Sequence, residues 1–185
     1  MSVLVFIEAA DGVVKKSSLE AITYGFKLAG APVTAIAMGS ISSDELAKVG
    51  VAGAAKVLHI ADSRLDNGVI QAYASALTQA VEKTGADTLV LATSSLGNAV
   101  AARVAVSMQA ALVSNVVDLP ETGSGFKVKR SIYTGKAFAM TEVTTAKKIL
   151  AIKKNAVEIK EDGTAASVEA LEVNLTDADF AAKIT

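Results

Sequence analysis

Four short apolar runs alternate with four helical patterns over the first 110 residues, and this alternation constrains the fold more than any other feature of the chain. The runs at residues 3–8, 33–38, 56–60 and 88–92 are rich in Val, Ile, Leu and Ala, which is typical of strands buried on both faces. Each run is followed by a segment with apolar residues at helical spacing. This repeated order predicts a mainly parallel sheet with helices on both faces and right-handed crossovers.

The residues beyond 110 follow a different pattern. Strand candidates at residues 112–118, 126–132, 137–144 and 147–152 succeed one another through short turns, with no helical pattern between them. Short connections favour antiparallel pairs, so these four segments predict an antiparallel extension. The predicted fold class is α/β: a three-layer sandwich with a mainly parallel, Rossmann-like sheet, plus an antiparallel β extension in the C-terminal third. We assign residues 1–160 to this domain and residues 161–185, with a strand-like run at 171–173, to a linker or docking arm.

Composition excludes several classes of function. The chain carries 18 basic and 19 acidic residues, and this net charge of −1 argues against a nucleic-acid-binding protein with a basic face. It has no cysteine, and its single histidine, His59, lies within an apolar run, so thiol catalysis and a conventional transition-metal site are not expected. We find no signal peptide and no apolar run near the roughly 20 residues of a membrane-spanning helix. We therefore expect a cytoplasmic protein without membrane insertion.

The turn after residues 88–92 is the first candidate site. Its polar and small residues are Ser94, Ser95, Gly97 and Asn98, and they stand where a buried strand passes into an amphipathic helix. Free backbone N–H groups at such a helix start can hold an anion or a nucleotide phosphate. In the simpler interpretation, Ser95 or Asn98 only caps the helix. If the turn binds an anion and Gly97 needs a positive φ angle, replacing Gly97 by a β-branched residue should abolish that binding.

The end of the first strand argues against a classical dinucleotide site. Glu8 and Asp11 place carboxylates where a Rossmann domain requires glycines, and an acidic turn repels a pyrophosphate. We expect both acids to be structural. No acid, base and nucleophile form a recognisable catalytic constellation, so we predict neither catalytic residues nor a metal site.

Residues 130–137 form the second candidate site. Arg130 supplies a cation, Tyr133 an amphipathic ring and Gly135 a flexible backbone. Two interpretations stay open: a hairpin with a packed tyrosine, or a docking surface for another domain or subunit, where Tyr and Arg are enriched.

Several of these segments together resemble the N-terminal domain of the electron-transfer flavoprotein alpha subunit. They are the opening strand, the Ala-Thr-Ser-Ser and Leu-Gly-Asn turn at 92–98, Val-Ala-Ala-Arg-Val-Ala at 100–105, Ala-Ala-Leu-Val-Ser-Asn-Val at 110–116, and Arg-x-x-Tyr-x-Gly-x-Ala at 130–137. The resemblance covers nearly the whole chain. The glycine-rich and Ser-Arg motifs that hold FAD in that family's second domain do not occur in these 185 residues.

The resemblance implies an electron-transfer component and not an enzyme in itself. It implies a scaffold and partner-binding domain of an alpha subunit that passes electrons from acyl-CoA-type dehydrogenases to a quinone-linked acceptor. The implied partners are the beta subunit, which binds AMP in that family, and the FAD domain of the alpha subunit, so FAD is not expected on this chain alone. Arg130, Tyr133, Gly135 and the tail from residue 170 are the predicted interface. The alternative is an AMP-type nucleotide-binding module of Rossmann-like fold that uses the Ser94 to Asn98 turn.

Overall fold

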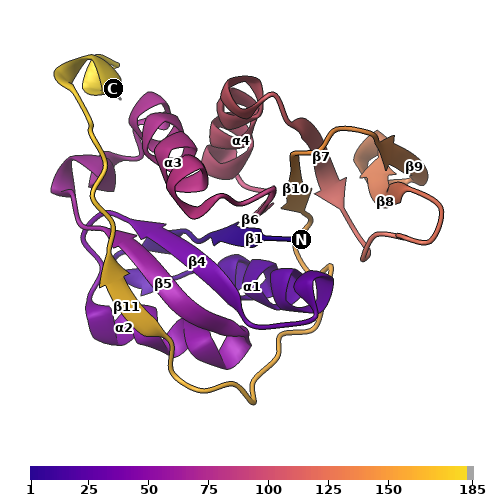
Figure 1. The fold of residues 1–185 in the computed structure, drawn as a ribbon, viewed down its shortest axis with the longest axis horizontal. Helices are drawn as coiled ribbons and strands as arrows, with labels where there is room; N and C mark the ends of the chain where they lie inside the picture. The colour runs from indigo at the N-terminus through magenta and orange to yellow at the C-terminus, as the bar shows by residue number, and fades with distance from the viewer. Residues whose placement is uncertain (183–185) are drawn as a thin grey trace.

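The structure, a computed structural model, describes residues 1–182 and contains a nine-stranded sheet (Figure 1). Its strand order is β11-β5-β4-β1-β6-β10-β7-β8-β9. The first strands along the chain are β1 (Val3–Phe6), β4 (Val33–Met38), β5 (Ala54–Ile60) and β6 (Thr88–Ala92). All pairs among these four are parallel, as the alternation of strands and helices predicts.

Helices cover both faces of the sheet. Helix α1 (Lys16–Ala29) and helix α2 (Ser43–Lys48) pack on one face, and α3 (Ile70–Thr84) and α4 (Ser95–Met108) pack on the other. Strand β1 contributes side chains to the core on both faces of the sheet. Leu4 and Phe6 lie in the core under α3 and α4, while Val3 and Val5 lie in the core under α1, because successive side chains of a strand point to opposite faces. The predicted three-layer, Rossmann-like sandwich is therefore confirmed.

The antiparallel extension is confirmed for three of its four strands. Strands β7 (Ala111–Val116), β8 (Phe126–Ile132) and β9 (Ala137–Val143) form antiparallel pairs in chain order. Strands β7 and β8 share one registered pair, Val116 with Arg130, so the β8–β9 hairpin diverges from the rest of the sheet.

The fourth strand corrects the prediction. Strand β10 (Lys148–Ile152) is not antiparallel; it lies between β6 and β7 and is parallel to both. Residues 149–152 are fully apolar and buried, which is the signature of a parallel strand covered on both faces. The short connection is possible because the turn before β10 returns to the start of β7, where the Ala111 N–H donates to the Lys147 carbonyl oxygen at 3.2 Å.

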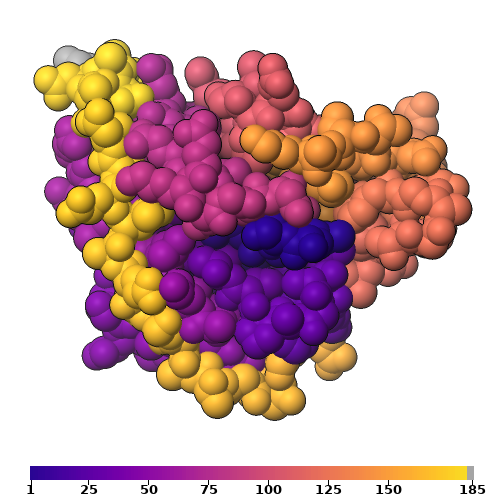
Figure 2. All heavy atoms as spheres, in the orientation of Figure 1, coloured from indigo at the N-terminus to yellow at the C-terminus, as the bar shows by residue number. Residues whose placement is uncertain are grey.

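The C-terminal segment lies along its own domain. Strand β11 (Ser167–Ala170) pairs in parallel with β5 at the sheet edge, so the strand falls before the predicted run at 171–173. Farther along, the Gln79 side chain bonds the backbone of Asn174 through both its amide atoms, at 2.8 and 2.9 Å. Figure 2 shows this segment as a continuous yellow band over the surface, with the antiparallel extension forming a lobe on the other side. The division of the chain near residue 160 stays a prediction.

The remaining regular elements are short. They are the hairpin strands β2 (Ala9–Ala10) and β3 (Val13–Val14) and the 3-10 turns η1 (Val49–Ala52), η2 (Ser63–Asn67), η3 (Tyr133–Gly135) and η4 (Asp177–Phe180).

Candidate functional site

Helix α4 starts directly after β6, and Ser94 is its N-cap. The Gly97 N–H donates to Ser94 Oγ at 2.7 Å, which satisfies one of the free donors at the helix start. The expected caps, Ser95 and Asn98, are both inside the helix. Helix α4 therefore begins one residue earlier than a Ser95 cap would place it.

Glu8 brings a carboxylate to this helix start from the end of β1. Its side chain is only 4% exposed. Glu8 Oε1 accepts a hydrogen bond from the Ser94 hydroxyl at 2.5 Å, and Oε2 lies 2.8 Å from Lys15 Nζ. The Glu8 N–H in turn donates to Ser18 Oγ at 2.8 Å. The crevice between β1 and β6, where the strand order reverses, therefore holds a carboxylate that belongs to the chain itself.

Gly97 is constrained by space and not by a left-handed backbone. It is absent from the glycines with positive φ in the described part of the chain, so the condition attached to the Gly97 prediction is not met. A Cβ atom at this position would lie 2.6 Å from the Ala92 carbonyl oxygen and 2.9 Å from Ser94 Oγ. The glycine lets α4 start close against the end of β6.

Acidic side chains also gather around Tyr73, whose hydroxyl senses the Glu8 charge. The pKa of Tyr73 is raised to about 12, mainly by burial and also by the neighbouring Asp66 and Glu8 carboxylates. A hollow of 270 Å³ beside Tyr73 is also lined by Asp11 and Asp66. A phosphate at the α4 N-terminus would meet the Glu8 carboxylate that accepts from the Ser94 hydroxyl, which opposes its binding. The residues of this crevice therefore do not fit the pyrophosphate of FAD, and anion binding by Ser94, Ser95, Gly97 and Asn98 stays a prediction that the charges oppose.

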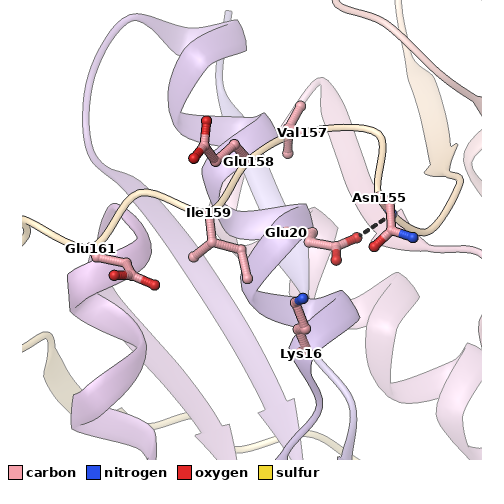
Figure 3. A pocket seen from close by; sticks show the side chains of 7 residues that line it. All are labelled: Lys16, Glu20, Asn155, Val157, Glu158, Ile159 and Glu161. Atoms are coloured by element: carbon pink, nitrogen blue, oxygen red, sulfur yellow. Dashed lines mark hydrogen bonds between the residues drawn. The ribbon is translucent and has the colours of Figure 1, made fainter.

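A second hollow, of 520 Å³, lies between α1 and the segment that follows β10 (Figure 3). Glu20, only 2% exposed, accepts a hydrogen bond from the Asn155 N–H at 2.8 Å. Three residues on, Thr23 Oγ1 accepts one from the Lys160 N–H at 3.1 Å. These bonds attach the segment that follows β10 to α1. The buried polar groups beside this hollow therefore have a structural role. Nothing in the sequence pattern indicated this role for Glu20.

The structure brings the three predicted interface residues together. Arg130, Tyr133 and Gly135 line a third hollow, of 530 Å³, which Asn115 and Lys153 also line. Arg130 comes from β8, Asn115 from β7, and Lys153 directly follows β10. The sequence pattern predicts neither Asn115 nor Lys153 as part of this site.

The backbone around this third hollow is unusual. Asn115, Tyr133, Thr134 and Gly135 all have positive φ angles, of 57°, 49°, 53° and 94°. Asn115 lies where the β7–β10 register shifts, so it occupies a β-bulge, a feature common next to functional sites. Left-handed conformations are unfavourable for tyrosine and threonine, and such residues persist where surrounding structure holds them.

Large apolar side chains are exposed beside the third hollow. Tyr133 is 76% exposed, Phe138 59% and Met140 51%. Phe138 lies opposite Ser131 in the β8–β9 register, and the Lys129 ammonium lies 5.0 Å from the Phe138 ring centroid. Apolar side chains gathered in this way are typical of a surface that another molecule covers.

Other chemistry-bearing residues have structural partners. His59 Nε2 is 2.8 Å from the Gly39 carbonyl oxygen, which connects the ends of β5 and β4. Within residues 1–182, no group of three or more acidic, histidine or cysteine side chains could hold a metal ion. No helix in the same range is long and apolar enough to cross a membrane.

The fold and these sites define a doubly wound α/β domain whose nucleotide-type crevice is filled by its own carboxylate and whose antiparallel extension is exposed. The family model for the electron transfer flavoprotein domain matches residues 3–178, and the chain belongs to this family. The family is one of flavoproteins.

Two relatives give the extent of the similarity. The electron transfer flavoprotein subunit alpha of Bacillus subtilis (strain 168) is 27% identical over 178 residues, which are 95% of this chain and 55% of that protein. The protein of the same name from Mycobacterium tuberculosis (strain ATCC 25618 / H37Rv) is 28% identical over 172 residues, or 92% of this chain and 53% of that protein. The chain thus spans about half the length of the curated relatives it matches.

Proposed function

We propose that this chain is the N-terminal half of an electron-transfer flavoprotein alpha subunit and serves as its scaffold and partner-binding domain in the cytoplasm. In this proposal the complete protein passes electrons from acyl-CoA-type dehydrogenases to a quinone-linked acceptor. The FAD is held by the alpha subunit's FAD domain, outside this chain, and the beta-type subunit carries AMP. The observation that carries the proposal is the family match over residues 3–178.

The candidate sites support a structural and not a catalytic role. The Ser94 hydroxyl already serves as the cap of α4 and donates to Glu8, so it is not held as a free nucleophile. His59 is engaged with a backbone oxygen of the neighbouring strand. The exposed tyrosine and the hollow beside it offer instead a surface for a partner, in the segment where the sequence predicts one.

The alternative, an AMP-type nucleotide-binding module, is less well supported. Its phosphate would have to displace the buried Glu8 carboxylate from the Ser94 hydroxyl at the start of α4. We therefore place any AMP in the beta-type subunit and not on this chain.

The test is co-expression of this chain with a beta-type subunit and a separately produced FAD domain. We expect the three to co-purify as a yellow complex and the chain alone to be colourless. One tightly bound flavin per isolated chain would contradict the assignment of FAD to another domain. A chain that co-purifies with neither partner would contradict the proposed function.

A further inference from the structure

Many of the basic residues of this chain lie in the β8–β9 hairpin and at the two ends of β10. Residues 122–157 contain eight lysines and arginines and a single acid, Glu142, which gives this stretch a charge of +7. The rest of the chain carries ten basic and eighteen acidic residues, a charge of −8. The near-neutral total therefore combines two parts of opposite sign, and residues 122–157 are the strongly positive part.

Two of these cations line the third hollow without an acidic partner. Neither Arg130 nor Lys153 lies within 4.0 Å of a carboxylate oxygen in the described range 1–182. An Arg130 Nη2–H donates to Ser114 Oγ at 3.1 Å, and the Lys153 ammonium donates weakly to Ser131 Oγ at 3.5 Å. The Nε–H of Arg130 is buried without an acceptor among these residues. A guanidinium so poorly satisfied is unfavourable and is suited to a carboxylate, which can accept two parallel N–H bonds from it.

We propose that this hollow is the anchor point for an acidic protein partner. In this inference a carboxylate side chain of the partner enters the hollow and pairs with Arg130 and Lys153, and the same partner covers Tyr133, Phe138 and Met140. The inference rests on the proposed function, which supplies the partner as a beta-type subunit. It adds the chemistry of recognition: the contacting face of that subunit carries aspartate or glutamate at the centre of an apolar patch.

The surroundings of the hollow favour a protein carboxylate over a small free anion. A small anion would leave the three exposed apolar side chains uncovered, whereas a protein interface combines an apolar centre with a few desolvated charges. The partner is also a separate chain in this inference. The relatives are about twice as long, so their second half would have to reach the hollow from the C-terminal side. The C-terminal end of the described chain, however, lies across the molecule from β8 and β9 (Figure 1).

Charge reversal in the hollow, with a matched control, tests the inference. The chain is co-expressed with a beta-type subunit, and the dissociation constant is measured for the wild type, Arg130→Glu, Lys153→Glu and Lys147→Glu. Lys147 is an exposed lysine of the same basic stretch but does not line the hollow. We expect each hollow variant to weaken the complex by about 30-fold or more, and the Lys147 variant by about threefold or less. Lys153→Glu changes an exposed side chain, so its result stands if Arg130→Glu unfolds the domain.

The dissociation constants and one further measurement separate the outcomes. A complex that forms but weakens equally in all three variants would overturn the anchor and leave the proposed function standing, whereas a wild-type chain that forms no complex overturns both. Inorganic phosphate titrated into the isolated chain provides the second arm. Arg130-dependent thermal stabilisation at submillimolar phosphate would identify a small-anion site and overturn the protein-carboxylate assignment; we expect none.

Discussion

Replacement of Ser94 by alanine should destabilise the domain far more than the loss of an ordinary helix cap. The Ser94 hydroxyl accepts from the Gly97 N–H and donates to the buried Glu8 carboxylate. Loss of an N-cap costs about 1 kcal/mol. Loss of a hydrogen bond to a charged, buried group costs about 1.5–3 kcal/mol. We therefore expect the Ser94→Ala variant to lose about 3 kcal/mol of unfolding free energy.

Ser42→Ala is the matched control. Ser42 caps α2 by accepting from the Glu45 N–H at 3.2 Å, and this cap is exposed with no buried carboxylate attached. Its loss should cost only the capping contribution of about 1 kcal/mol. Urea denaturation followed by circular dichroism gives both values, and the expected difference is about 2 kcal/mol.

A double-mutant cycle with Glu8→Gln isolates the contact between the two side chains. We expect the Ser94→Ala change to cost about 1 kcal/mol less in the Glu8→Gln background than in the wild type, because the charge-assisted bond is already gone. Equal costs for Ser94→Ala and Ser42→Ala, together with additive effects in the cycle, would refute the interpretation that Glu8 occupies the helix start as a bound anion.

Three other predictions follow from local geometry. Gly97→Ala should lower the unfolding free energy by about 1–3 kcal/mol, because its Cβ would lie 2.6 Å from a backbone oxygen, while Gly123→Ala, with nothing within 4 Å, should be tolerated in the same melt. Tyr24→Phe should cost about 1 kcal/mol in chemical denaturation, since the buried phenol donates to a backbone oxygen of the β7–β8 connection at 2.9 Å. Hydrogen bonds from the Thr176 N–H and hydroxyl hold the pKa of Asp179 below its ordinary 3.8, so this cap is fully formed above about pH 4 and is lost as the pH falls through the lowered pKa. Amide exchange of the C-terminal segment should accelerate over that acid range; an unchanged rate would contradict the capping role.

The core of the fold could be predicted from the sequence because local patterns and burial agree there. Gly30 and Gly85, for example, adopt the left-handed conformation directly after α1 and α3, as glycine commonly does at the end of a helix. Strand β10 could not be placed in the same way. Its neighbours β6 and β7 are distant in sequence, so no local pattern reveals the pairing. Short connections favour antiparallel pairs, but here the burial of Ile149 and Leu150 on both faces of the sheet favours the parallel position.

The candidate sites show the same division between local and long-range information. The clustering of Arg130, Tyr133 and Gly135 follows from their closeness in sequence. The hydrogen bond between Glu8 and Ser94 joins residues 86 positions apart, so neither motif alone revealed that a carboxylate occupies the helix start. Lys153 reaches the third hollow only because β10 lies beside β7, and that pairing was itself not predicted.

The position of β10 also determines when the sheet can close during synthesis. Strands β6 and β7 have no direct pairing and are joined only through β10. A ribosome adding about 5–20 residues per second needs several seconds to extend the chain from the end of β6 at Ala92 to the end of β10 at Ile152. Throughout that interval β6 has an open edge, and the antiparallel strands share no strand pairing with the parallel core. We expect a nascent chain that ends before residue 148 to hold two unconnected sheets and to be the species most prone to aggregation and most readily bound by chaperones.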